Sequence, residues 1–267
     1  MTIEIALQDG RTVKHCEALV LTFCERDFSY RNYDLAPVPE DNVLTLDQVR
    51  LANRIIARMP LRVAESLSHD SERISQALSR VPPVVDLEDK ASDIPWSAIE
   101  NLFAVCLRPG ARTASVTKVL HKKRPRLIPI LDSVVAGYLS RVGGLRNPDQ
   151  ANEAWWAVQL VRVAKRDIDN NGEGFRILQR NLAGKGYLFS IVRLYDILFW
   201  AWSGEYSPTW QDTPVSTASR PANRSGGKRP MPEFVKEMIR QANIKYWRRP
   251  EARERMRKIQ LQRRGKR

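Results

Sequence analysis

Hydrophobic side chains recur at intervals of three and four residues through most of this chain, which is the spacing of one helical face. In the segment 45–59, Thr45 followed by Gln48 has the form of a capping box, and Pro60 ends the pattern. Further helices are predicted at 71–81, 96–107, 113–121, 133–142, 149–167, 174–182 and 187–203. These patterns predict an all-α protein.

The start of the chain is the exception to this helical pattern. Residues 3–7 and 11–13 flank an Asp9-Gly10 pair, and this arrangement predicts a small β-hairpin. The sequence from Val13 onward fits the beginning of a helix equally well, so both interpretations stay open.

Proline, glycine and serine mark the predicted domain boundaries. Residues 1–203 are predicted to form a helical domain, with a candidate subdivision at the turn-rich connector 81–93. Residues 204–232 contain many Pro, Ser, Thr and Gly residues and are predicted to form a flexible linker. The segment 233–267 is then predicted to form a basic helical tail, with helices at 233–247 and 251–264.

Composition excludes several classes of protein. The longest apolar runs are much shorter than the roughly 20 residues of a membrane-spanning helix. The first residues lack the basic and apolar regions of a secretory signal, so we expect a cytoplasmic protein that does not enter a membrane. Three cysteines are too few for a disulfide framework and lack zinc-site spacing, so we expect buried thiols and neither a metal nor a cofactor.

The net charge of +14 is concentrated at one end of the chain. Residues 221–267 contain 16 basic and 4 acidic side chains, a net charge of +12, whereas the other 220 residues carry 28 and 26, a net charge of +2. Such a basic segment is typical of a polyanionic partner, and nucleic acid is the commonest one in the cytoplasm. An anionic membrane is disfavoured because the segment lacks a wide apolar face.

A second one-sided stretch lies between Glu100 and Asp149, where Asp132 is the only carboxylate. Seven basic residues fall within 19 positions of this stretch: Arg108, Arg112, Lys118, Lys122, Lys123, Arg124 and Arg126. Globular surfaces usually mix the two signs of charge. The stretch therefore predicts a phosphate-facing surface on an ordered loop, with a solvated charge run as the alternative.

The same stretch has a distinctive order of elements. A helix, a tight Pro109-Gly110 turn and a second helix are followed by a loop bracketed by prolines, and Asp132 opens the next helix. A hairpin between two helices can direct main-chain N–H groups at a phosphate, and the positive end of the second helix adds to the attraction. Such contacts hold a nucleic-acid backbone without reading its bases.

In residues 110–114 (GARTA) and 129–132 (PILD), the chain resembles the helix-hairpin-helix DNA glycosylases, and most closely their mismatch adenine glycosylase branch. The resemblance covers residues 107–139. It implies a helical glycosylase-like domain that binds double-stranded DNA and flips one nucleotide into a pocket. It further implies that Asp132 is catalytic and stabilises the positive charge that develops on the sugar. Because Arg112 stands near the position of the lysine in bifunctional members, the enzyme would be monofunctional.

The candidate site therefore combines Asp132 with a set of phosphate contacts. That set consists of Gly110, Arg112, Thr113, Lys118, His121, Lys122, Lys123, Arg124 and Arg126. His121 also fits a helix end, where a cation suits the helix dipole. Asp132 equally fits a simple helix N-cap, and the sequence leaves the two roles open.

Other charged residues have simpler interpretations. Arg193 and Asp196 lie three residues apart on an apolar helix, which predicts an ion pair. The segment 30–34 (YRNYD) is predicted to form a structured turn, with Asp34 as an alternative second carboxylate. Two further functions stay open beside the glycosylase: a non-catalytic helix-hairpin-helix DNA-binding module and a nucleic-acid-targeting defence protein.

Overall fold

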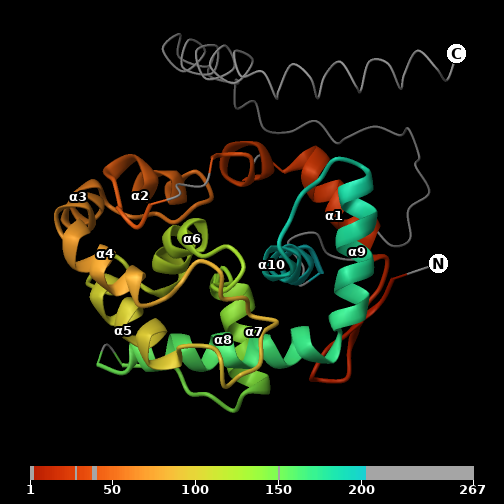
Figure 1. Ribbon diagram of the computed structural model, residues 1–267. Coiled ribbons are helices and arrows are strands. Elements are labelled where there is room, and N and C mark those ends of the chain that lie inside the picture. The colour runs from red at the N-terminus through yellow and green to blue at the C-terminus, as the bar shows by residue number, and fades with distance from the viewer. Residues whose placement is uncertain (1–2, 28, 38–40, 150, 203–267) are drawn as a thin grey trace, which may run out of the picture. The chain divides into compact units, whose positions relative to one another are not determined.

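The protein is all-α apart from one small hairpin in the part of the chain that the structure describes (Figure 1). This computed structural model describes residues 3–202, except 28, 38–40 and 150. The predicted linker and basic tail therefore lie outside the described residues. The elements are β1 (Ile5–Ala6), β2 (Thr12–Val13), α1 (Cys16–Arg26), the π-helical turn η1 (Tyr30–Asp34), α2 (Leu46–Asn53), α3 (Leu61–His69), α4 (Ser71–Ser79), α5 (Trp96–Cys106), α6 (Thr113–Lys123), α7 (Ser133–Val142), α8 (Glu153–Asn170), α9 (Gly172–Gly184) and α10 (Ile191–Trp202).

Helix α2 begins as its sequence predicts but ends early. The Thr45 hydroxyl accepts a hydrogen bond from the Gln48 N–H, and the Gln48 side chain accepts one from the Thr45 N–H, so the capping box is confirmed. The predicted helix 45–59 is wrong beyond Asn53. The Asn53 side chain binds both the N–H and the carbonyl of Met59, which closes residues 54–59 into a loop.

The predicted hairpin is confirmed, and buried polar contacts fasten it to the helices. Strand β1 pairs antiparallel with β2, with Ile5 opposite Val13. The buried carboxylate of Asp167 accepts hydrogen bonds from the Gln8 N–H and from the hydroxyls of Tyr138 and Tyr195. Burial raises the pKa of Asp167. The hairpin is thereby tied to helices α7, α8 and α10.

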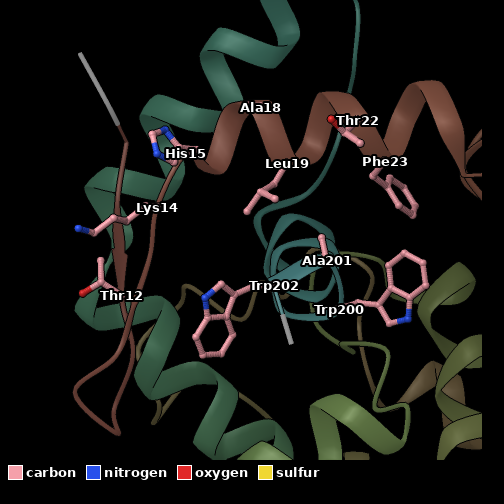
Figure 2. A pocket seen from close by; sticks show the side chains of 10 residues that line it. All are labelled: Thr12, Lys14, His15, Ala18, Leu19, Thr22, Phe23, Trp200, Ala201 and Trp202. Carbon is pink, nitrogen blue, oxygen red and sulfur yellow. The ribbon is translucent and has the colours of Figure 1, made fainter. Parts of the chain in front are cut away.

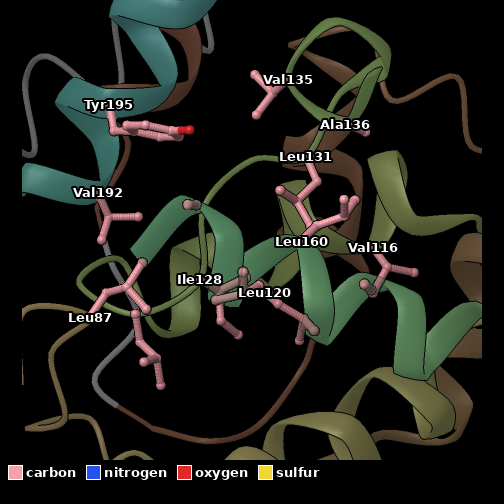
Figure 3. Packing of buried hydrophobic residues seen from close by; sticks show 14 of the residues in the cluster. Leu87, Val116, Leu120, Ile128, Leu131, Val135, Ala136, Leu160, Val192 and Tyr195 are labelled. Atoms are coloured by element: carbon pink, nitrogen blue, oxygen red, sulfur yellow. The ribbon is translucent and has the colours of Figure 1, made fainter. Parts of the chain in front are cut away.

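One main hydrophobic core joins the helices on both sides of the connector 81–93. Helices α6, α8 and α10 direct Val116, Leu120, Leu160 and Val192 into it, as Figure 3 shows. Burying an aliphatic side chain of this size contributes about 1.5–3 kcal/mol. The three cysteines are buried and free, as expected. Among the described residues, no helix has the length and apolarity needed to span a bilayer.

Helix α6 is buried along its whole length, although its sequence is basic. Its cations donate hydrogen bonds to main-chain carbonyls of the surrounding loops. Lys118 binds the carbonyl of Ile55, Lys122 those of Asp34 and Ala36, Lys123 those of Asp41 and Val43, and Arg124, at the helix C-cap, those of Leu78 and Val81. These four residues, the α6 cations, hold residues 34–36 and 41–43, the loop after α2 and the C-terminal end of α4 against the core.

This burial corrects the prediction of a phosphate-facing loop. The side chains of Lys118, Lys122, Lys123 and Arg124 are buried, and internal carbonyls take the place expected for phosphate. His121 is buried too, and its Nδ1 lies 2.7 Å from the carbonyl oxygen of Ile128. The charge pattern was misread because main-chain carbonyls, which carry no formal charge, balance these cations. Arg126 is exposed, but Asp86 binds its guanidinium.

The α6 cations predict a stability difference between two neighbouring arginines. Arg124→Ala should leave the buried Val81 carbonyl without a donor and the Leu78 carbonyl with only the Val81 N–H, and should cost about 2–4 kcal/mol of unfolding free energy. The matched control, Arg126→Ala, removes an ion pair in which the arginine is exposed and buried Asp86 keeps the N–H of Glu88, and it should cost about 1 kcal/mol. Urea denaturation of both variants measures the difference, and equal losses would contradict this account of α6.

Candidate nucleic-acid interface

The predicted tight turn between α5 and α6 is present. The N–H and carbonyl of Arg108 bind the carbonyl and N–H of Ala111, and Gly110 has a positive φ of 86°. A Cβ atom at Gly110 would lie 2.9 Å from Cγ2 of Val63, so glycine is needed for both the turn and the packing. The order helix, hairpin, helix thus occurs in three dimensions. The wider glycosylase likeness stays a prediction.

An internal carboxylate occupies the N-terminal end of α6. Glu153 is buried, and its Oε1 accepts hydrogen bonds from both the N–H and the hydroxyl of Thr113, each at 2.9 Å. Its Oε2 lies 2.7 Å from Nε of Arg112. These are the groups that the sequence assigned to a phosphate. Because Glu153 already binds them, the predicted phosphate contacts at Arg112 and Thr113 are replaced by an intramolecular anion.

Asp132 is the N-cap of α7 and is partly exposed. Its Oδ1 accepts hydrogen bonds from the N–H groups of Val134 and Val135, both at 3.0 Å, so the capping interpretation is confirmed. The preceding segment is fixed by the Ile130 N–H, which donates to Asp196, and by the Leu131 N–H, which donates to Thr117. A catalytic role for Asp132 stays a prediction.

Arg193 joins two carboxylates from different parts of the chain. Its Nε and Nη2 donate to Asp34 at 2.7 and 2.9 Å, and its Nη1 lies 4.0 Å from Oδ2 of Asp196, so the predicted ion pair with Asp196 is present as the longer of the two. Burial raises the pKa of Asp196 well above its usual value. Asp34 ends the turn η1 and is engaged in this bidentate pair. Its geometry therefore supports a structural role.

Four exposed arginines lie on the stretch from α2 through the following loop to α3: Arg50, Arg54, Arg58 and Arg62. We call them the arginine row. None of the four forms an ion pair with another described residue. Exposed Ile56 and Leu61, with more than half of each residue accessible, lie among them. The row combines available positive charge with apolar surface.

Hydrogen bonds from α6 hold the loop 54–59 in a strained backbone conformation. Ile56 and Arg58 have positive φ values of 61° and 51°, which are unusual for residues other than glycine. Lys118 Nζ donates to the carbonyl of Ile55 at 2.8 Å, and the Ser115 hydroxyl donates to that of Ala57 at 2.7 Å. Backbone strain of this kind costs about 1–3 kcal/mol per residue and persists where surrounding contacts enforce it. The loop is therefore preorganised.

Asp132 lies near this loop. Ile55 packs with Ile130 and with Tyr33 in a small apolar cluster separate from the main core, which joins the loop to the segment just before Asp132. Burial lowers the pKa of Lys118, Asp132 opposes that shift, and Arg193 and Arg58 add to it. The charges of Asp132 and of Arg58 therefore both act on the amine of Lys118, which places the two residues near the same point of α6.

The arginine row is not among the residues that the sequence patterns single out, although the sequence contains a signal for it. No carboxylate occurs between Asp47 and Glu65, so this stretch is as one-sided as the one around α6. The predicted helix 45–59 contains Arg50, Arg54 and Arg58, and a regular helix there gives no reason to assign them to a site. Only the break at Asn53 shows that they extend over two helices and a loop.

A groove on the other side of the domain contains none of the predicted site residues. It has a volume of about 530 Å³, and α1, the end of β2 and the end of α10 line it. Figure 2 shows Trp200 and Trp202 projecting to opposite sides of α10, while His15 and Lys14 lie at the hairpin end. Across the described residues, no group of three or more His, Cys, Asp or Glu side chains is arranged to hold a metal ion.

Comparison with known proteins gives one match. A family model described as "Family of unknown function (DUF6308)" matches residues 25–203, which is more than half of the chain. The matched range includes the arginine row, the whole of α6 and Asp132. No curated protein matches the chain, and no solved structure matches it.

The buried imidazole next to this site predicts a dependence of stability on pH. Burial is the main cause that lowers the pKa of His121 to about 3, from 6.5. Below pH 6.5 the unfolded chain therefore binds a proton that the folded chain does not, and stability falls as the pH decreases toward 3. As the pH decreases near 5, the unfolding free energy of wild type should fall about 1.4 kcal/mol per pH unit faster than that of His121→Gln. Denaturation between pH 5 and 7 measures this, and equal slopes for the two proteins would contradict the prediction.

Proposed function

The chain belongs to the DUF6308 family, and we propose that it binds nucleic acid through the arginine row. The observation that carries the proposal is the set of four exposed arginines without ion pairs on a loop that buried contacts hold in place. Guanidinium groups bind phosphate oxygens with two parallel hydrogen bonds. A preorganised loop gives up little conformational freedom on binding, so its charges act at low entropic cost.

The charge of the rest of the chain supports the same partner. The segment 221–267, with its net charge of +12, would add a long-range electrostatic attraction to the phosphate backbone. The α6 cations and Glu153 are engaged internally, so the proposed interface does not use them. Arginine contacts to phosphate are independent of sequence, and they position the nucleic acid rather than select it.

We further propose that Asp132 acts on double-stranded DNA as a monofunctional glycosylase would. The residue is partly exposed, lies near the loop 54–59, and its Oδ1 is held by two N–H groups. A carboxylate fixed in this way could stabilise an oxocarbenium-like sugar without reorganising. A DNA-binding module without chemistry uses the same arginine row and differs in having no role for Asp132 beyond capping.

The arginine row predicts a change in the salt dependence of binding. Arg54→Gln combined with Arg58→Gln should remove about two phosphate contacts, which lowers the log–log salt slope by roughly 2 and weakens affinity. Fluorescence anisotropy with a labelled duplex between 50 and 200 mM salt, about the range over which such contacts matter, measures the slope. The control Arg176→Gln combined with Arg180→Gln changes exposed arginines on α9. An equal effect of the two pairs would contradict the proposed interface.

Asp132→Asn separates the enzyme from the binding module. The variant keeps the size of the side chain and most of its capping ability but removes the negative charge. Base release should slow by roughly 100-fold or more, while DNA affinity stays equal or rises because a charge of the same sign as phosphate is lost. Single-turnover assays on duplexes with defined lesions, followed by alkali to cleave abasic sites, measure the rate.

Two results would contradict the catalytic role. Either wild type leaves every tested lesion intact, or Asp132→Asn releases bases as fast as wild type. In both cases the binding module accounts for the data, and the variant should then lose about 1 kcal/mol or less of stability.

A further inference from the structure

A second cleft, of about 580 Å³, is lined by the C-terminal end of α6, the residues just after it, α9 and the start of α10. We call it the Lys122 cleft. Its lining includes Lys122, Arg126, Arg180, Arg193, Glu88 and Ser190. Its volume is in the range of small-ligand sites. None of the functions proposed above uses it.

Lys122 differs from the other buried lysines in how its amine is held. Its Nζ lies 3.3 and 3.2 Å from the carbonyl oxygens of Asp34 and Ala36. Lys118, Lys123 and Lys165 each make a contact of 2.8 Å or shorter to a carbonyl, and the last two also bind a carboxylate. Lys122 therefore has the loosest anchorage of the four, and it lines a cleft.

The charges around Lys122 leave it without a carboxylate partner. The carboxylate of Asp34 binds Arg193, and the face of the Tyr33 ring lies 4.5 Å from the amine. Burial lowers the pKa of Lys122 to about 8, Asp34 opposes that shift, and Arg193 adds to it. A sizeable fraction of the amine is therefore neutral near pH 8, and only a neutral amine is a nucleophile.

We propose that the Lys122 cleft binds a small carbonyl compound that carries an acidic group, and that the amine of Lys122 condenses with its carbonyl carbon. The amine nitrogen attacks that carbon and forms a C–N bond. The carbonyl oxygen then leaves as water with the two hydrogens of the neutral amine, and a C=N double bond remains. The step involves no oxidation or reduction, and hydrolysis reverses it.

Other groups in the cleft suit this chemistry. Glu88 lines the same cleft and contacts Arg176 at 3.2 Å; burial is the main cause that raises the pKa of its carboxyl, and Arg176 opposes that shift. Its carboxyl is the acid–base group of the cleft that would pass a proton to the leaving oxygen. Arg180, whose contact with Glu173 is 3.4 Å long between two exposed side chains, is available for the acidic group of the ligand. Arg193 and Arg126 are paired with Asp34 and Asp86, which also line the cleft, so these two pairs add no net charge to its wall.

Reductive trapping on the full chain tests the proposal. Glyoxylate, an aldehyde with a carboxylate, is added with cyanoborohydride, which converts an imine into a stable amine, and peptide mass mapping locates the product. The trapping rate at Lys122 near pH 7.5 should exceed that at exposed Lys185 by about 10-fold or more, because burial lowers the pKa of Lys122 and the cleft holds the ligand beside its amine. Lys122→Arg should lose only this product, whereas Lys123→Arg should keep it.

Three outcomes would overturn the proposal. Lys122 stays unmodified while exposed lysines react, or it reacts no faster than Lys123, or acetaldehyde, which has no acidic group, reacts at Lys122 as fast as glyoxylate. The wild-type rates decide the first two even where Lys122→Arg fails to fold. Because the assay contains no nucleic acid, its result is independent of the proposed binding through the arginine row.

Discussion

Helix α6 brings four cations into the interior, and the carbonyl groups of neighbouring loops solvate them. A buried charge without partners costs several kcal/mol, so each of these side chains requires acceptors, and the loops require donors for carbonyls that the helices do not satisfy. Lys118, Lys123 and Arg124 meet both requirements at once. The loops that connect α1 to α5 are therefore positioned by charge–dipole contacts from a single helix, in addition to apolar packing.

This dependence extends to the candidate interface. The strained loop 54–59 keeps its conformation because Lys118 and Ser115, both on α6, bind its carbonyls. Asp132 follows a segment whose Leu131 N–H binds Thr117, also on α6. The buried residues of α6 and the exposed arginines are thus linked through the loop 54–59. The buried residues of α6 determine where the exposed arginines lie. Substitutions of these buried residues would therefore displace the loop 54–59 and the segment before Asp132.

Sequence periodicity was a good guide to the helices and a poor guide to the site. The bounds of α7 and the capping box of α2 follow from local chemistry, since the groups that end or begin a helix are neighbours in sequence. Burial of Lys122 or Arg124 depends instead on carbonyls about 40 to 90 residues away, which no local pattern records. The same holds for Glu153, which is 40 residues from Thr113. Charge alone cannot show whether an arginine faces solvent, as Arg54 does, or a carbonyl, as Arg124 does.

The burial of α6 also limits where proteases can cut the folded chain. The bonds after Lys122 and Lys123 are two consecutive sites for a trypsin-like enzyme, whereas Pro125 blocks the bond after Arg124. Such an enzyme must draw several residues of extended backbone into its active site before it cuts. In the folded protein these bonds lie in and at the end of a covered helix, so cleavage there requires the domain to open as a whole. The densest run of basic residues in the body of the chain is in this way its most protected one, and its cutting would report unfolding rather than surface exposure.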